Sequence, residues 1–194
     1  MKSKISKILI IMGLLICVGS LSIKGYSKYL ENKSTKSFEE KIDKNPNEPK
    51  EDDFSNVKAG DEIAIINIPA IKLNTVVIES IEKEYLNHYV CHFENTAMPG
   101  QYGNFSLAGH SSYRYNEVFN ELHKISLGDE IIIKTLNNEF TYIVNDILEV
   151  NPEDTYVLDQ DNEIKELTIV TCTNKGKDRL IVKAKIDDDK NNNK

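Results

Sequence analysis

The sequence has few cysteines, and this scarcity excludes a disulfide-stapled fold. Only three cysteines occur in 194 residues. Cys17 lies within an apolar run, which leaves Cys91 and Cys172 for the rest of the chain. Two cysteines are too few for a disulfide framework, so stability must come from the packing of an apolar core.

Clusters of positive charge and glycine-rich loops are also missing. The formal net charge is −7 at pH 7. Phosphate binding needs a clustered basic face, and the sequence shows none, so we expect no nucleic acid partner. The absence of a Gly-rich phosphate loop and of an internal repeat argues against nucleotide chemistry.

The first 29 residues predict a membrane anchor. Residues 1–7 carry three lysines, and residues 8–23 carry no charge. This run is short for a span, but snorkelling of Lys24 and two nearby tyrosines can extend it. We therefore expect a cytoplasmic N-terminus (1–7), a single-pass anchor in the lipid bilayer of the cell membrane (8–29) and an extracellular remainder. A cleavable signal peptide is the alternative, although no A-x-A-like cleavage site follows the run.

The remaining chain divides into a stalk, a domain and a tail. Residues 30–60 are rich in Lys, Glu, Asp, Asn and Ser and include Pro46 and Pro49. Such a segment cannot bury enough surface to offset its chain entropy, so a flexible stalk is expected. Residues 61–187 form the predicted folded domain, and the polar tail 188–194 is expected to be disordered.

Within the domain, short strand-like segments alternate with turns and predict a mainly β fold with few helices. Asn137-Asn138 indicates a hairpin, Asn116–Lys124 has helical spacing, and Tyr85–Val90 fits either a strand or a helix. This pattern fits a sandwich or a barrel, and periodicity does not choose between them. The expected strands are Glu62–Ile68, Ile71–Ile78, Asn104–Gly109, Glu130–Thr135, Glu139–Val150, Glu166–Cys172 and Leu180–Ile186.

A thiol, an imidazole and a guanidinium stand at the ends of these strands. Cys172 closes one strand and Arg179 precedes the next, so one hairpin could hold both at one rim. His110 follows the segment that ends at Gly109. Acyl transfer needs a polarisable nucleophile, a proton carrier and a permanent positive charge. The alternative is a buried apolar Cys172, a satisfied His110 and a solvated Arg179.

Five motifs follow one another along residues 60–187, and together they resemble the sortases, bacterial cysteine transpeptidases that attach proteins to the cell envelope. The segment that ends in Cys172 is similar to the TLxTC signature of this family. The motifs are His92–Gly100 followed by Gly103-Asn104, Ser106-Leu107-Ala108-Gly109-His110, Phe119–Leu122 with Leu127–Ile131, Val150–Asp154, and Thr168–Cys172 with Arg179.

The resemblance implies a closed eight-stranded β-barrel with a peptide site. In it, Cys172 is the nucleophile, His110 the acid and base, and Arg179 the group that stabilises the oxyanion. Thr171 shapes the pocket or contacts the peptide, with an ordinary β-branched strand residue as the alternative. His92 matches a position near the groove, so a peptide-facing role is expected, with an ordinary strand-end histidine as the alternative.

The implied reaction is transpeptidation. The enzyme would cleave an LPxTG-type sorting signal of a secreted surface protein through a thioacyl intermediate and join it to a peptidoglycan precursor amine, without ATP or a redox cofactor. Missing lid and C-terminal anchor elements favour a class D-like or class A-like sortase. Ser111 departs from the arginine of many relatives, which leaves the recognised peptide open. The alternatives are a thiol peptidase that hydrolyses its substrate and a non-catalytic peptide-binding barrel.

No metal site is expected. His88, Cys91 and His92 lie close together in sequence, but a structural zinc site needs four ligands and further candidates are scarce. Calcium occurs in part of the family, yet no loop has the ligand spacing to predict it. If Cys91 lies near Cys172, the two could form an inactivating disulfide.

Overall fold

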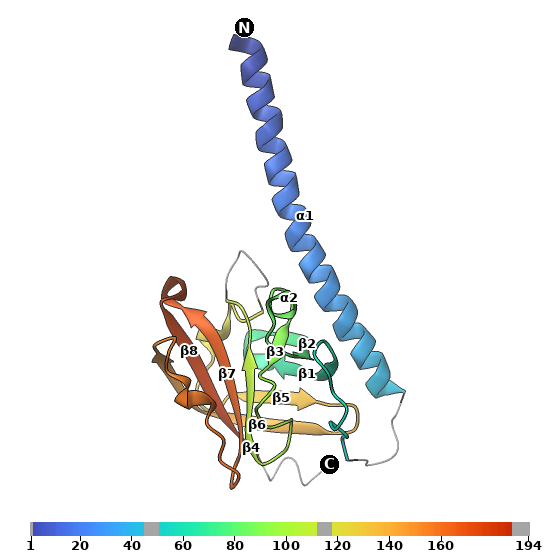
Figure 1. Cartoon of the computed structure of the whole chain (residues 1–194), viewed down its shortest axis with the longest axis vertical. Coiled ribbons are helices and arrows are strands. Elements are labelled where there is room, and N and C mark those ends of the chain that lie inside the picture. Colours follow the sequence, from blue (N-terminus) through green and yellow to red (C-terminus); the bar gives the residue numbers. More distant parts are fainter. Residues whose placement is uncertain (1, 45–50, 112–117, 188–194) are drawn as a thin grey trace.

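A β-rich body and one long helix make up the protein (Figure 1). The computed structural model describes residues 2–44, 51–111 and 118–187. The strands are β1 (Glu62–Ile68), β2 (Leu73–Glu79), β3 (Val90–His92), β4 (Gly103–Ala108), β5 (Glu130–Lys134), β6 (Glu139–Val150), β7 (Lys165–Thr173) and β8 (Asp178–Ile186). The helices are α1 (Lys2–Asp43) and α2 (Lys83–Leu86), with short 3-10 turns η1 (Pro69–Ile71), η2 (Leu122–Lys124), η3 (Thr155–Leu158) and η4 (Asn174–Gly176).

The strands close into a barrel in the order β1-β2-β3-β4-β7-β8-β6-β5. The pairs β2 with β3 and β4 with β7 are parallel, and the other neighbours are antiparallel. The predicted mainly β fold with a closed eight-stranded barrel is therefore confirmed. Asn137 and Asn138 form the expected turn between β5 and β6, whereas the ambiguous segment around Tyr85 contains the short helix α2 followed by β3.

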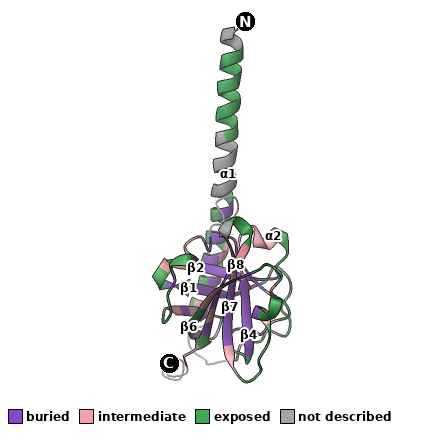
Figure 2. Ribbon diagram, turned by 90° about the vertical axis from the view of Figure 1, so that its left-hand side faces the viewer, coloured by how far each residue is buried: buried purple, intermediate pink, exposed green. Residues whose placement is uncertain are grey.

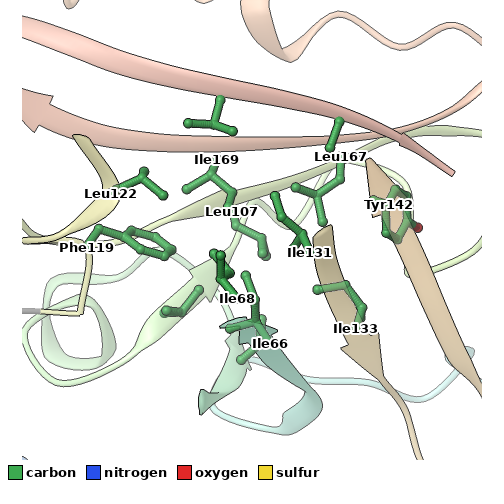
Figure 3. Packing of buried hydrophobic residues seen from close by; sticks show 14 of the residues in the cluster. Ile66, Ile68, Leu107, Phe119, Leu122, Ile131, Ile133, Tyr142, Leu167 and Ile169 are labelled. Carbon is green, nitrogen blue, oxygen red and sulfur yellow. The ribbon is translucent and has the colours of Figure 1, made fainter. Parts of the chain in front are cut away.

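Apolar side chains from every part of the barrel wall fill its interior (Figure 3). Strand β5 shows the alternation clearly, because Ile131 and Ile133 are fully buried while their neighbours are partly exposed. Tyr142 is also buried, and its hydroxyl accepts a hydrogen bond of 2.9 Å from the Gly100 main-chain N–H. Burial raises the pKa of Tyr142 to about 12. Removal of this apolar surface from water is the main force that holds the barrel together.

The C-terminal half of α1 packs on the outer face of β1 and β2. Phe38 is 1% exposed and forms a cluster with Ile65, Val76 and Ile78. The hydroxyl of Thr35 accepts a hydrogen bond of 3.1 Å from the Val76 N–H. The expectation of a flexible stalk over residues 30–60 is therefore wrong for its helical part, 30–43. The average composition of the segment is polar, but it includes a few apolar residues at helical spacing. These residues stabilise a helix when they pack against a sheet.

Residues 51–60 are also attached to the barrel, and residues 45–50 lie outside the described part of the chain. The carboxylate of Asp52 accepts hydrogen bonds from the Thr135 hydroxyl (2.6 Å), the Asn137 main-chain N–H (3.2 Å) and the Asn138 side-chain amide (2.8 Å). These contacts fasten the segment that precedes β1 to the β5–β6 hairpin. The predicted tail, 188–194, likewise lies outside the described residues.

The N-terminal half of α1 extends away from the barrel, and the apolar side chains between residues 5 and 16 are exposed (Figure 2). In the described parts of the chain, no helix combines the length and the apolar character that a membrane span requires. The anchor expected over residues 8–29 is thus not supported by the structure.

Candidate active site

The ends of β4, β7 and β8 bring the three predicted catalytic residues to one rim of the barrel. The last register pair of the parallel strands β4 and β7 is Ala108 with Val170. Two residues farther along each segment stand His110 and Cys172. Strand β8 returns antiparallel to β7 and pairs Arg179 directly with Cys172. The thiol is therefore flanked by the histidine segment on one side and by the arginine on the other.

Cys172 faces the outer surface of the barrel. Leu167 and Ile169 of β7 lie in the interior core, and successive side chains of a strand alternate between its two faces. Val170 and Cys172 consequently face outward, and both are partly exposed. A peptide that lies along the outside of β4 and β7 can reach the thiol.

His110 is partly buried at the end of β4, and its main chain is anchored on both sides. The Gly109 N–H donates to the Val170 carbonyl (3.2 Å), and the Phe119 N–H donates to the His110 carbonyl (3.0 Å). Desolvation lowers the pKa of His110 below its ordinary value of 6.5, because burial disfavours the charged imidazolium. The imidazole is thereby shifted towards its neutral form, which can accept a proton.

Gly109 allows the chain to approach Phe119 closely. A Cβ atom at residue 109 would lie 2.5 Å from Cδ2 of Phe119 and 3.2 Å from Cγ2 of Val118. Both neighbours are buried, so neither can move away cheaply. The close approach of Phe119 therefore explains why glycine precedes His110.

Arg179 is partly buried and rests on the turn between β7 and β8. Its Nη1 donates to the carbonyl oxygens of Gly176 and Asp178, each at 3.2 Å. A guanidinium carries five N–H donors, so these two bonds leave it able to bind a further acceptor. Its register position opposite Cys172 places this permanent charge on the strand next to the thiol.

Thr171 does not line the outer face, contrary to the expectation of a substrate contact. Its side chain is 3% exposed, and its hydroxyl donates to the Gly109 carbonyl at 2.7 Å. The odd and even positions of a strand point to opposite faces, so the neighbour of an outward Cys172 must point inward. Thr171 therefore links β7 to the residue that precedes His110.

His92 is also placed differently from the expectation. Its side chain is 0% exposed and packs against the ring of Phe105 in the barrel interior. The Nδ1 atom lies 2.7 Å from Oε2 of Glu79. A peptide on the outer face cannot reach this ring, so the expected peptide contact of His92 is wrong and its role is internal.

Cys91 is separated from Cys172 by an intervening strand. Cys91 pairs with Ala108 of β4, and Ala108 pairs with Val170 of β7. Two steps between neighbouring strands amount to about 10 Å, which exceeds the Cα separation of about 4.4–6.8 Å that a disulfide needs. The hypothesis of a Cys91–Cys172 disulfide is therefore incompatible with this fold.

A short, partly exposed apolar strip lies beside Cys172 on the outer face. It begins with the register neighbours Ala108 and Val170. The segment between β6 and β7 forms one side of this strip, because Val157 and Leu158 pack with Val170 and Ile181. The arrangement provides an apolar surface beside the nucleophile.

Gln160, which sequence reasoning missed, ties that segment to the start of β4. Its Oε1 accepts from the N–H groups of Ala97 (3.2 Å) and Asn104 (2.9 Å). Its Nε2 donates to the carbonyls of Asn104 (3.1 Å) and Leu158 (2.8 Å). A glutamine in a polar loop carries no local signal, so only the folded structure could identify this role.

His88 and His92, which were considered as zinc ligands, bind to separate partners. Nδ1 of His88 lies 2.8 Å from the Ser27 hydroxyl of α1, whereas His92 bonds to Glu79. Over the residues with described positions, no group of three or more His, Cys, Asp or Glu side chains is arranged to hold a metal ion.

Comparison with known proteins assigns residues 66–187 to the family model described as the sortase domain. Among curated proteins, the chain is 33% identical over 111 residues to Sortase A of Bacillus anthracis, a match that covers 57% of this chain and 51% of that protein. The chain spans about half the length of the curated relatives it matches first, with coverage of 51%, 45% and 56%.

Solved structures give the same result. A Clostridium perfringens Sortase D5 transpeptidase is 43% identical with a TM-score of 0.66, over 86% of this chain and 99% of that one. A lid mutant of Sortase A from Corynebacterium diphtheriae is 28% identical with a TM-score of 0.64, over 70% of this chain and 74% of that one.

Proposed function

Because the chain belongs to the sortase family, we propose that it is a cysteine transpeptidase with Cys172 as nucleophile. The observation that carries this proposal is the shared rim of β4, β7 and β8, where His110 follows the strand beside Cys172 and Arg179 lies opposite it. Acyl transfer by a thiol uses a nucleophile, a proton carrier and a positive charge that lie close together.

In the first half-reaction, the Cys172 thiolate attacks a peptide carbonyl carbon and forms a C–S bond. The electron pair of the carbonyl moves to its oxygen, and Arg179 stabilises the resulting negative charge. Collapse of this intermediate breaks the C–N bond, and His110 donates a proton to the departing amine. The product is a thioacyl enzyme.

In the second half-reaction, an acceptor amine attacks the thioacyl carbon. His110, now neutral, takes a proton from the attacking nitrogen, and the C–S bond breaks to regenerate the thiolate. One amide bond replaces another, so the reaction needs no external energy source. The lowered pKa of His110 supports its return to the neutral form between the two steps.

The proposed substrate is an LPxTG-type sorting signal of a secreted surface protein, and the proposed acceptor is a peptidoglycan precursor amine. The apolar strip of Ala108 and Val170 beside Cys172 supports a peptide with apolar residues before the cleaved bond. Likeness to the Sortase D5 transpeptidase at 43% identity supports the class D alternative over class A.

The test is a ligation assay on the full chain. The protein is incubated with a panel of LPxTG-type peptides and a cell-wall stem peptide, and products are followed by mass spectrometry. We expect cleavage joined to ligation, lost in Cys172→Ala and kept in the matched control Cys17→Ala. Cleavage without ligation to any amine would instead support the thiol peptidase, and the absence of both product and thioacyl adduct would support a binding barrel.

We further propose that the catalytic domain acts outside the cell membrane, where a cell-wall acceptor is found. Protease added to intact cells should then degrade the domain. Protection from the protease until the cells are lysed would contradict this location.

A further inference from the structure

We propose that Ser111 is a positioning residue that holds His110 beside Cys172 through a side-chain hydrogen bond across the two strands. This inference rests on the proposed function of the same site. The Ser111 hydroxyl donates to the main-chain carbonyl of Cys172. The bond therefore joins the residue after the histidine to the nucleophilic residue itself.

The bond lies where the regular pairing of β4 and β7 has ended. The ladder runs in register up to Ala108 and Val170, and the Gly109 N–H adds one more main-chain bond to Val170. Beyond this point two hydroxyls continue the coupling. Thr171 donates to the Gly109 carbonyl at 2.7 Å, and Ser111 donates to the Cys172 carbonyl.

The residues on both sides of His110 are consequently hydrogen-bonded to β7. Gly109 is bonded to Val170 and Thr171, while Ser111 is bonded to Cys172. A residue whose two neighbours are both tied to β7 cannot shift along β7 without breaking these bonds. This matters because a displacement of about 1 Å in a catalytic geometry can cost on the order of 100-fold in rate.

Serine suits the task for a physical reason. Its hydroxyl is a donor on a side chain with one rotatable bond, so little rotamer entropy is lost when it is fixed. The bond also uses the main-chain carbonyl of Cys172 and leaves the thiol available for chemistry. The motif around His110 thus contains a positioning group one residue beyond the histidine.

Thr135 provides a matched control on the far end of the barrel wall. Its side chain is 1% exposed, and its hydroxyl donates to Asp52 at 2.6 Å. Like Ser111→Ala, Thr135→Val removes a hydroxyl that bonds two segments, but it does so away from the rim with Cys172. It reports the effect of lost stability alone.

The experiment measures the rate at which iodoacetamide alkylates Cys172 in the full chain, as a function of pH, together with kcat and KM for ligation. We expect Ser111→Ala to lower kcat by about 10-fold to 100-fold at nearly unchanged KM. The plot of alkylation rate against pH should contain an inflection that is due to His110 and is lost in His110→Asn. We expect Ser111→Ala to lose the same inflection. Ser111→Thr, which keeps the hydroxyl, should restore both readouts.

Alkylation needs no peptide, so it tests the positioning role even if the wild-type protein ligates none of the peptides and the proposed function fails. A Ser111→Ala protein with the wild-type kcat and alkylation profile would overturn the inference. So would a kcat loss that Thr135→Val reproduces at an equal decrease in Tm, because the effect would then be one of stability.

Discussion

Oε2 of Glu79 lies 2.7 Å from Nδ1 of His92 inside the barrel wall, with the two residues 6% and 0% exposed. The opposite ring nitrogen, Nε2, lies 2.9 Å from the Thr96 hydroxyl and 3.1 Å from the Ala97 carbonyl. Thr96 already donates to the Phe93 carbonyl at 2.8 Å, so its oxygen accepts at the ring and Nε2 carries a hydrogen. The pair joins β2, β3 and the turn after β3.

Removal of one member of this pair should destabilise the fold. Glu79→Ala leaves a buried ring nitrogen without its partner, and an unsatisfied buried polar group costs about 1–3 kcal/mol. The free energy of unfolding in urea measures this loss. Glu62→Ala, which breaks the exposed contact with Lys41, should cost about 1 kcal/mol or less. An equal cost for both variants would contradict the structural role of His92.

His110 should make stability depend on pH. In the unfolded chain the imidazole takes up a proton as the pH falls through about 6.5, whereas burial delays protonation of the folded protein to a lower pH. The free energy of unfolding should therefore decrease as the pH falls from about 6.5 to the folded pKa, because the unfolded state binds more protons there.

His110→Asn should flatten this part of the profile. Denaturant unfolding between pH 5 and pH 8 measures it, with His123→Asn as the control that removes an exposed imidazole. If the free energy of unfolding of wild type increased relative to that of His110→Asn as the pH fell, a lowered pKa of His110 would be excluded.

The two described cysteines should differ in reactivity. Burial, with a smaller effect of the Glu79 carboxylate, raises the pKa of Cys91 to about 12, and the residue is 0% exposed. The thiolate is the reactive form, so Cys91 stays protonated and inaccessible. Iodoacetamide near pH 8 should label Cys172 in the native protein and Cys91 only after denaturation. Peptide mapping shows which residue is labelled, and native labelling of Cys91 at a rate equal to Cys172 would refute its burial.

Gly109→Ala should displace His110. The added Cβ would lie 2.5 Å from the Phe119 ring, and relief of this overlap must move either the ring or the main chain that carries His110. Such overpacking costs about 1–3 kcal/mol. Ligation activity should fall together with Tm, while Gly25→Ala, where no atom lies within 4 Å, should lower neither. Full activity of Gly109→Ala would show that residue 109 is not sterically limited.

Several elements of this protein could be predicted because their signals are local. Runs rich in apolar and β-branched residues predicted β1 and β6 with the bounds that the structure has. Such a run is apolar throughout in β1 because one face lies in the barrel interior and the other packs on α1. The Asn137-Asn138 turn is likewise a property of adjacent residues. Cys172 and Arg179 could be placed together because a hairpin brings the end of one strand to the start of the next.

Other features depended on partners far away in sequence. Residues 30–43 became an ordered helix because β1 and β2 present Ile65, Val76 and Ile78 to Phe38. His92 turned inward because Glu79 supplies its acceptor, and Gln160 acquired its role from Asn104. The sequence alone thus predicted most of the strands, the turn between β5 and β6 and the candidate catalytic residues, whereas it did not separate α2 from β3. The tertiary structure decided which polar groups are buried and paired, because burial depends on contacts between segments that no local pattern records.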